Sequence, residues 1–154
     1  MVLKKGLSRA KSRGFTLIEL LVVISVIGIL VSVVASSFTT GQKRSRDTKR
    51  RADLQAVQKS LEQCYALTGL YPVAAQVVSG SGLTCGTQTT MNQIPFDPKN
   101  NGSYVYTYSV TAELDGYCYC ALLEQIGGGN ADTAGSNGAC SLTAGDYQCT
   151  ANQQ

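Results

Sequence analysis

The stretch Phe15-Thr-Leu-Ile-Glu19-Leu-Leu-Val-Val-Ile-Ser-Val-Ile-Gly28-Ile-Leu-Val-Ser-Val-Val-Ala-Ser-Ser-Phe38 decides the fold of this 154-residue chain. It is 24 residues long, and Glu19 is its only charged side chain. As an α-helix rising about 1.5 Å per residue it would span about 36 Å, and the hydrocarbon core of a bilayer is about 30 Å thick. A lone segment in lipid must satisfy its own backbone hydrogen bonds, so the sequence predicts a membrane-spanning helix over residues 15–38.

The charges of the chain are strongly segregated. Residues 1–13 carry five basic groups and no acid, residues 43–59 have a net charge of +5, and residues 60–154 have a net charge of −6. The basic N-terminus predicts that this end stays in the cytoplasm. The acidic C-terminal part would repel phosphate, which argues against a nucleic-acid partner.

Two simple interpretations of the apolar segment leave Glu19 unexplained. A secretory signal peptide, cut after Val33-x-Ala35, would have a shorter apolar run of about 7–15 residues. A plain membrane anchor would bury the carboxylate at a cost of about 2.5–3.5 kcal/mol at the bilayer centre. An ionisable group inside a membrane is by default a functional-site hypothesis, and its charge partner has to be identified.

The residues around the start of the segment, Lys11-Ser-Arg-Gly14-Phe15-Thr-Leu-Ile-Glu19, resemble the processing site of type IV pilins and type II secretion pseudopilins. The resemblance implies that residues 1–14 are a prepilin leader, which a prepilin peptidase removes by cutting between Gly14 and Phe15. It also implies that the new N-terminus, Phe15, is methylated. The amine of Phe15 would be mostly protonated at neutral pH, since an α-amino group has a pKa of about 7.7–8.0.

The same motif supplies a partner for Glu19. In a bundle of such helices the carboxylate of Glu19 would pair with the ammonium of Phe15 in a neighbouring copy, at a stagger of about four residues or 6 Å. An ion pair in an apolar medium is far less costly than an isolated charge. Glu19 is therefore predicted to be an assembly charge that selects one axial offset between subunits.

Residues 39–68 are predicted to continue the helix as an amphipathic half. Leu54, Val57, Leu61 and Cys64 recur at helical spacing, and Gly69 and Tyr71-Pro72 mark the end. The basic residues 43–51 would contact either the acidic head of a neighbouring copy or anionic lipid headgroups.

Residues 69–154 are predicted to form a small β head. Alternation predicts strands over Ser103–Thr111 and Tyr117–Leu123 with a hairpin turn at 112–116, and a third strand near Asp146–Thr150. The tyrosines of the first strand favour cross-strand packing over a stacking platform for nucleic acid or sugar. The fold class is α+β, with a long N-terminal helix packed on a small antiparallel sheet, and the segment from Ile94-Pro-Phe96-Asp97-Pro98 to Leu123-Glu124 resembles a major pseudopilin head.

Six cysteines in a head outside the membrane predict disulfides, with fifteen possible pairings. The candidates are Cys64, Cys85, Cys118, Cys120, Cys140 and Cys149. Cys118 and Cys120 share one face of a strand and are not expected to pair with each other. A Cys140–Cys149 bond would resemble the disulfide-bounded loop of many pilins, and this leaves Cys64 and Cys85 to pair with Cys118 and Cys120. A four-cysteine zinc site is the minor alternative, because no C-x2-C spacing occurs.

The resemblance also implies a calcium loop near the C-terminus, and Asp132 and Asp146 are its candidate ligands. No cofactor other than this calcium is expected. The chain has no His, and no constellation of residues suggests catalysis, so we expect no enzyme.

The resemblance predicts a structural subunit, a pilin, of a helical type IV pilus-like filament. Its partners would be further copies of the chain, the prepilin peptidase, the assembly machinery and the membrane. It would be stored as a single-pass protein of the cytoplasmic membrane with its N-terminus inside, and would then enter an extracellular or periplasmic filament. The alternatives are the major pseudopilin of a type II secretion system and, more remotely, a membrane-anchored adhesin.

Overall fold

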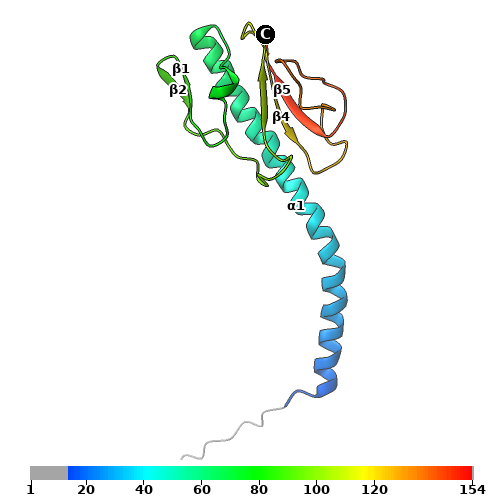
Figure 1. Ribbon diagram of the computed structural model, residues 1–154. Coiled ribbons are helices and arrows are strands. Elements are labelled where there is room, and N and C mark those ends of the chain that lie inside the picture. Colours follow the sequence, from blue (N-terminus) through cyan, green and yellow to red (C-terminus); the bar gives the residue numbers. More distant parts are fainter. Residues whose placement is uncertain (1–13, 154) are drawn as a thin grey trace, which may run out of the picture. The chain divides into compact units, whose positions relative to one another are not determined.

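The computed structural model describes residues 14–153, apart from the side chains of Ala35 and Ser36. The predicted leader, except for Gly14, therefore lies outside the described residues, as do the five basic groups that precede the apolar segment. The chain divides into two compact units, with the boundary between Thr39 and Thr40. One long helix crosses this boundary, and small antiparallel sheets follow it (Figure 1), which is the predicted α+β architecture.

The helix α1 covers Leu17–Thr68, a total of 52 residues, and Gly41 does not interrupt it. Its apolar half lies in the first unit, where each large apolar side chain from Leu17 to Phe38 is at least 48% exposed. Among the described residues, α1 is the one helix long and apolar enough to cross a membrane. The prediction of a membrane-length helix at this end is confirmed in length and composition.

The second half of α1 buries a single stripe of side chains. Leu54, Val57, Leu61 and Cys64 are 0% exposed, as their spacing predicted. The helix ends at Thr68 because Gly69 adopts a positive φ of 74° and donates its N–H to the carbonyl of Tyr65 at 2.7 Å. This backbone conformation suits glycine, and it satisfies one of the helix's last carbonyl groups.

The main sheet of the second unit has the order β3-β4-β5 and is antiparallel throughout. Its strands are β3 (Thr107–Val110), β4 (Tyr117–Leu122) and β5 (Tyr147–Ala151). All three were predicted, but the first begins at Thr107 instead of Ser103. Tyr104 lies outside it: its backbone pairs with Asn101 in an isolated bridge, and its ring sits 5.0 Å from the guanidinium carbon of Arg50 and 4.0 Å from Nζ of Lys99.

The central strand β4 is buried on both of its faces. Tyr117, Tyr119 and Ala121 join the core that also contains the apolar stripe of α1. Cys118 and Cys120 point to the opposite face and form a second cluster with Ala131 and Cys149. The alternation of tyrosine and cysteine in the sequence thus separates two small cores.

A second hairpin was not predicted. It consists of β1 (Leu83–Cys85) and β2 (Gln88–Met91), and it follows the 3-10 turn η1 (Ala74–Gln76). Gly86, with a φ of 61°, provides the left-handed residue in its two-residue turn. The strands were missed because they are short and mostly polar, which leaves no alternating pattern to detect.

Candidate assembly site

The N-terminus of α1 is closed by a reciprocal pair of hydrogen bonds between Thr16 and Glu19. The backbone N–H of Thr16 donates to Oε2 of Glu19 at 2.9 Å, and the N–H of Glu19 donates to Oγ1 of Thr16 at 3.3 Å. The Thr16 hydroxyl also donates to the same carboxylate oxygen at 2.8 Å. This arrangement is a capping box, and its Thr-x-x-Glu signal was present in the sequence but was not used in the prediction.

Gly14 and Phe15, the predicted cleavage and methylation positions, are exposed. A side chain at Gly14 would meet no described atom within 4 Å. The described residues therefore give no packing reason for glycine at this position. Phe15 is 82% exposed.

The large apolar side chains of the segment that follows are exposed among the described residues. Leu17 is 88% exposed and Ile29 is 68% exposed. Exposed apolar area of this extent is stable only in contact with lipid or with other apolar surfaces. Within the described residues the segment is thus an exposed apolar surface suited to contact with lipid or with other apolar helices.

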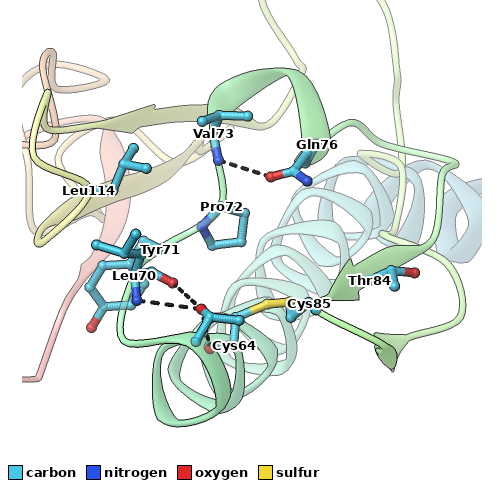
Figure 2. Close-up of a pocket in the computed structure, with 11 residues that line it drawn as sticks. Cys64, Leu70, Tyr71, Pro72, Val73, Gln76, Thr84, Cys85 and Leu114 are labelled. Atoms are coloured by element: carbon cyan, nitrogen blue, oxygen red, sulfur yellow. Dashed lines mark hydrogen bonds between the residues drawn. A yellow bond between two sulfur atoms is a disulfide. The ribbon is translucent and has the colours of Figure 1, made fainter.

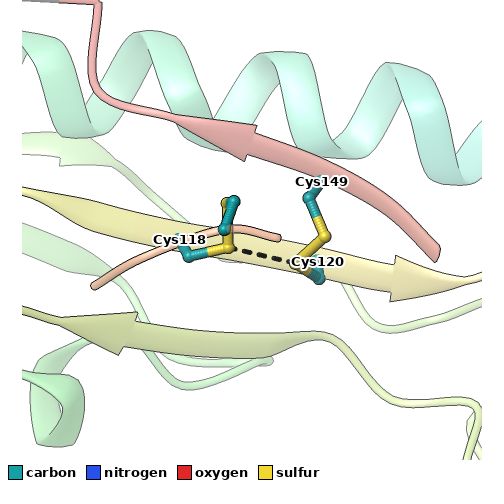
Figure 3. A group of neighbouring side chains, drawn as sticks. Cys118, Cys120 and Cys149 are labelled. Atoms are coloured by element: carbon teal, nitrogen blue, oxygen red, sulfur yellow. Dashed lines mark hydrogen bonds between the residues drawn. A yellow bond between two sulfur atoms is a disulfide. The ribbon is translucent and has the colours of Figure 1, made fainter. Parts of the chain in front are cut away.

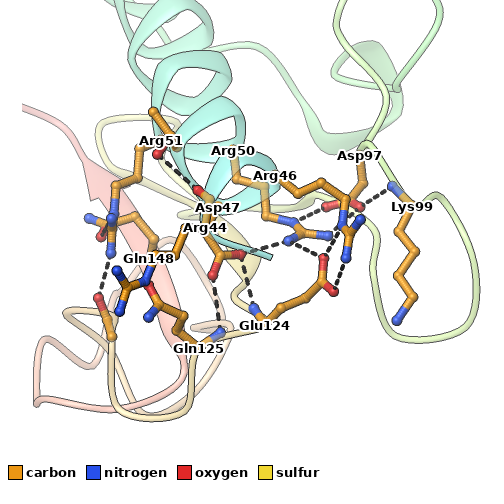
Figure 4. Close-up of polar contacts among 12 residues, drawn as sticks. Arg44, Arg46, Asp47, Arg50, Arg51, Asp97, Lys99, Glu124, Gln125 and Gln148 are labelled. Atoms are coloured by element: carbon orange, nitrogen blue, oxygen red, sulfur yellow. Dashed lines mark hydrogen bonds and ion pairs between the residues drawn. The ribbon is translucent and has the colours of Figure 1, made fainter. Parts of the chain in front are cut away.

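In the second unit, Arg50 is the centre of a buried charge cluster (Figure 4). Its side chain is 0% exposed, and its guanidinium donates two hydrogen bonds to Asp97, at 2.6 and 2.8 Å. It also donates to Asp47 at 2.7 Å and to Glu124 at 3.0 Å. Burial opposes the charge of Arg50, but these hydrogen bonds raise its pKa, so the cation is retained inside the fold.

Glu124 and Asp47 connect this cluster to the end of β4. Arg46 donates two hydrogen bonds to the carboxylate of Glu124, at 2.5 and 2.7 Å. Together with the hydrogen bond from Arg50, they lower the pKa of Glu124 to about 2. The carboxylate of Asp47 accepts the backbone N–H groups of Glu124 and Gln125 at 2.9 and 3.0 Å. Helix α1 is therefore tied to the loop after β4 by paired, hydrogen-bonded charges.

These pairs correct one expectation for the basic residues 43–51. Arg46 and Arg50 are paired with acids of their own head, so they are not available for the head of a neighbour. Lys43, Arg44 and Lys49 are exposed, and within residues 14–153 none of them forms an ion pair. Arg51, the sixth basic residue, donates to the carbonyl of Gly128 and to the side chain of Gln148 within its own head. Lys43, Arg44 and Lys49 therefore remain for a contact with lipid or with another subunit.

The disulfide pairing differs from the expected one. The bonds are Cys64–Cys85, Cys118–Cys140 and Cys120–Cys149, so Cys140 and Cys149 do not pair with each other. Cys149 lies opposite Cys120 in the register of β4 and β5, and this register selects their bond. Cys64–Cys85 joins the end of α1 to β1 and forms part of the wall of a cavity of about 210 Å³ (Figure 2).

The tyrosines of the sheet pack against one another and against α1. Tyr71 and Tyr117 both donate to the carboxylate of Glu62, at 3.0 and 3.1 Å, and their rings are 4.7 Å apart. Tyr106 donates to Asp53 at 2.7 Å. These contacts agree with the expected packing role: Tyr71 and Tyr117 are buried in the core, and the half-buried Tyr106 packs against it. Tyr119 is different, because its buried hydroxyl has no hydrogen-bond partner among residues 14–153.

Asp132 and Asp146, the candidate calcium ligands, both have hydrogen bonds within the head. Asp146 accepts the N–H of Gly127 at 2.7 Å. Hydrogen bonds from Ser141 and Thr143 lower the pKa of Asp132. A calcium site at these two residues stays a prediction.

Comparison with known proteins places these features in context. Residues 9–35 match the family described as the prokaryotic N-terminal methylation motif. Over 102 residues the chain is 28% identical to the type IV major pilin protein PilA of Myxococcus xanthus, a match that covers 66% of this chain and 39% of that protein.

Two further relatives are type II secretion system core protein G from two organisms. The chain is 30% identical to the protein of Dickeya chrysanthemi over 90 residues, covering 58% of this chain and 54% of that one. It is 33% identical to the protein of Escherichia coli over 66 residues, a match that covers 43% of this chain and 46% of that protein. The chain thus spans about half the length of these curated relatives, or less. No solved structure matches the chain significantly.

Proposed function

We propose that this chain, a homologue of type IV pilins and of type II secretion pseudopilins, is a structural subunit that polymerises into a helical filament through its apolar helix. The observation that carries the proposal is the exposed apolar segment of α1, headed by the capped carboxylate of Glu19. Before assembly lipid would cover this segment. In the filament the same segments of neighbouring copies would cover it.

The chain would be made as a membrane precursor. Its basic leader, residues 1–14, would hold the N-terminus in the cytoplasm. A prepilin peptidase would cut between Gly14 and Phe15 and methylate Phe15. The head would then lie outside the cytoplasm, where the oxidising conditions suit its three disulfides. Residues 15–38 would form the filament core, residues 39–68 the amphipathic helix half and residues 69–154 the head.

The capping box would hold the carboxylate of Glu19 in hydrogen bonds with Thr16 before assembly. Both of its partners are atoms of Thr16, which lies after the cleaved bond, so the cap survives removal of the leader. The carboxylate would then exchange some of these hydrogen bonds for the ammonium of a neighbouring Phe15. The subunit's role would be mechanical, with no chemistry of its own.

A major pseudopilin of a type II secretion system is the second candidate. Two of the relatives above are core protein G of such systems, and the buried Arg50–Asp97 pair uses the Asp97-Pro98 segment that resembles a pseudopilin head. Both candidates share the membrane precursor and the helical core. They differ in the length and the location of the fibre.

The processing step is tested by intact-mass and N-terminal analysis of the protein from its native membrane. We expect a chain beginning at methylated Phe15. Gly14→Val should block cleavage without altering the fold, whereas Gly41→Ala is a matched control, since its added side chain also meets no atom within 4 Å. A mature N-terminus near Ser36 would indicate ordinary signal-peptide removal and would refute the proposal.

Assembly is tested by electron microscopy of material sheared from cells. Long surface filaments that contain this chain would support a pilus. Their absence, together with short fibres in membrane fractions, would support a secretion pseudopilus. A mature protein that is monomeric both in the sheared material and in the membrane fractions would exclude both candidates.

A further inference from the structure

Four cysteine sulfurs of the head lie together at one face of β4. The Sγ atoms of Cys118, Cys120, Cys140 and Cys149 are all within 4.8 Å of one another, and those of Cys118 and Cys120 are 3.3 Å apart (Figure 3). They come from two adjacent disulfides, Cys118–Cys140 and Cys120–Cys149. Cys118 and Cys120 share one face of β4, and the strand register places Cys149 opposite Cys120, so four sulfurs gather on that face.

We propose that in its thiol form the head binds one divalent metal ion of the zinc type through these four cysteines. A tetrahedral zinc site has Zn–S bonds of about 2.3 Å, so its sulfurs are about 3.8 Å apart. The Cys118 and Cys120 sulfurs, at 3.3 Å, are closer than this value, and the whole group lies within 4.8 Å. Once both disulfides are reduced, side-chain rotations would bring the four sulfurs to the spacing of a tetrathiolate site.

The backbone that carries these sulfurs is already ordered. Cys118 and Cys120 belong to β4, which is hydrogen-bonded to a strand on each side, and Cys149 lies opposite Cys120 on β5. Only Cys140 comes from a loop. Three of the four ligands are thus positioned by sheet register, which reduces the entropy lost when a metal binds.

The surroundings of the cluster fit a closed, structural type of site. Cys118, Cys120 and Cys149 are buried, and Ala134 and Tyr147 pack around them. Carbonyl oxygens of Thr133, Ala134 and Thr150 lie 3.6–3.9 Å from three of the sulfurs. In the thiol form these carbonyls would accept S–H hydrogen bonds, and a metal would displace those protons. Thiolate ligands select zinc or cobalt over calcium or magnesium.

The metal site requires the four cysteines to be thiols. A newly made chain carries thiols and needs no reductant. From the oxidised head, each of the two disulfides takes two electrons from one phosphine molecule, which with one water gives a phosphine oxide and two thiols. One Zn²⁺ then replaces four thiol protons and leaves a site of net charge −2. The zinc ion and the two disulfides would use the same cysteines, so only one of them can cross-link β4, β5 and the loop that carries Cys140.

The third disulfide provides an internal control. Cys64–Cys85 lies in the other core cluster and shares no residue with the proposed site. Removing it should leave metal binding unchanged, whereas removing one member of the four-cysteine cluster should abolish tetrathiolate binding.

The test uses the full-length chain in detergent, reduced with a phosphine, freed of reductant without oxygen and titrated with Co²⁺. We expect one Co²⁺ per chain, with thiolate-to-cobalt charge-transfer bands and tetrahedral visible bands that Zn²⁺ removes. Cys64→Ser/Cys85→Ser should retain these spectra, and Cys120→Ser/Cys149→Ser should lose them. No tetrathiolate spectrum, or the same spectrum in both double variants, would overturn the proposal.

Thiol alkylation followed by mass spectrometry distinguishes an ordered site from metal binding by an unfolded chain. Zn²⁺ should slow alkylation of Cys118, Cys120, Cys140 and Cys149 about tenfold or more, because a metal-bound thiolate is a poor nucleophile. The alkylation rates of Cys64 and Cys85, which are buried in the other core cluster, should not change when Zn²⁺ is added. Equal protection of all six cysteines, or of none, would contradict the assignment.

Discussion

Thr16 and Glu19 are hydrogen-bonded to each other at the start of α1. The backbone N–H and the hydroxyl of Thr16 both donate to one carboxylate oxygen of Glu19, at 2.9 and 2.8 Å. A charge that would be costly in an apolar medium is therefore hydrogen-bonded before any neighbour arrives. The same carboxylate is the proposed partner of the Phe15 amine in the next copy. Helix capping and subunit assembly thus depend on one side chain.

Glu19→Gln should strongly reduce filament formation, because the amide can still cap the helix but offers no charge to the neighbouring ammonium. Thr16→Val keeps the charge and removes the hydroxyl of the cap, at a cost of about 1 kcal/mol, so filaments should form in lower yield. The measurement is the amount of this chain in sheared filaments. Glu113→Gln, an exposed acid of the head, is the control. Normal filament yield from Glu19→Gln would contradict the charge-pair hypothesis.

Arg50→Met should destabilise the head by about 3–5 kcal/mol, because it leaves the buried carboxylates of Asp97 and Asp47 without their cation. Arg44→Met, which changes an exposed residue of the same helix, should alter stability by about 0.5 kcal/mol or less. Thermal unfolding followed by circular dichroism in detergent measures the difference. Equal unfolding temperatures for the two variants would show that the buried cluster contributes little.

Stability should fall in acid as Glu124 becomes protonated. The pKa of Glu124 is lowered from 4.5 to about 2 in the folded chain, so its contribution is complete above the unfolded-state value and is lost as the pH falls from about 4.5 towards 2. Arg46 and Arg50 stay charged throughout this range. Glu124→Gln should be less stable at pH 7 and should lose less stability over that interval. An identical pH profile for the variant and the parent would argue against this linkage.

Two tyrosines on one face of β4 should respond in opposite directions to loss of the hydroxyl. Tyr119→Phe removes a buried oxygen with no partner and should stabilise the head by about 1 kcal/mol. Tyr117→Phe removes a hydrogen bond to Glu62 and should destabilise it by about 1 kcal/mol. Denaturant unfolding of the two variants and the parent gives both values. A loss of stability in Tyr119→Phe would mean that its hydroxyl has a partner after all.

Local pattern was enough to predict the elements that depend on neighbouring residues. The membrane-length helix follows from an apolar run with one charge, and the buried stripe at Leu54, Val57 and Leu61 follows from helical spacing. The two faces of β4 follow from strict alternation of tyrosine and cysteine. The capping box was equally local, because Thr16 and Glu19 are three residues apart, and it was missed only because Glu19 was considered for its charge alone.

Pairings between distant residues depend on how the head folds, and no local pattern specifies them. Six cysteines allow fifteen pairings, and the register of β4 and β5 places Cys149 opposite Cys120 instead of beside Cys140. Arg50 pairs with Asp97, 47 residues further along the chain, only because the loop that carries Asp97 returns to α1. Periodicity and composition report on the surroundings of each residue along the chain. Which sulfur or carboxylate meets which partner is set by long-range packing of strands and loops on the helix.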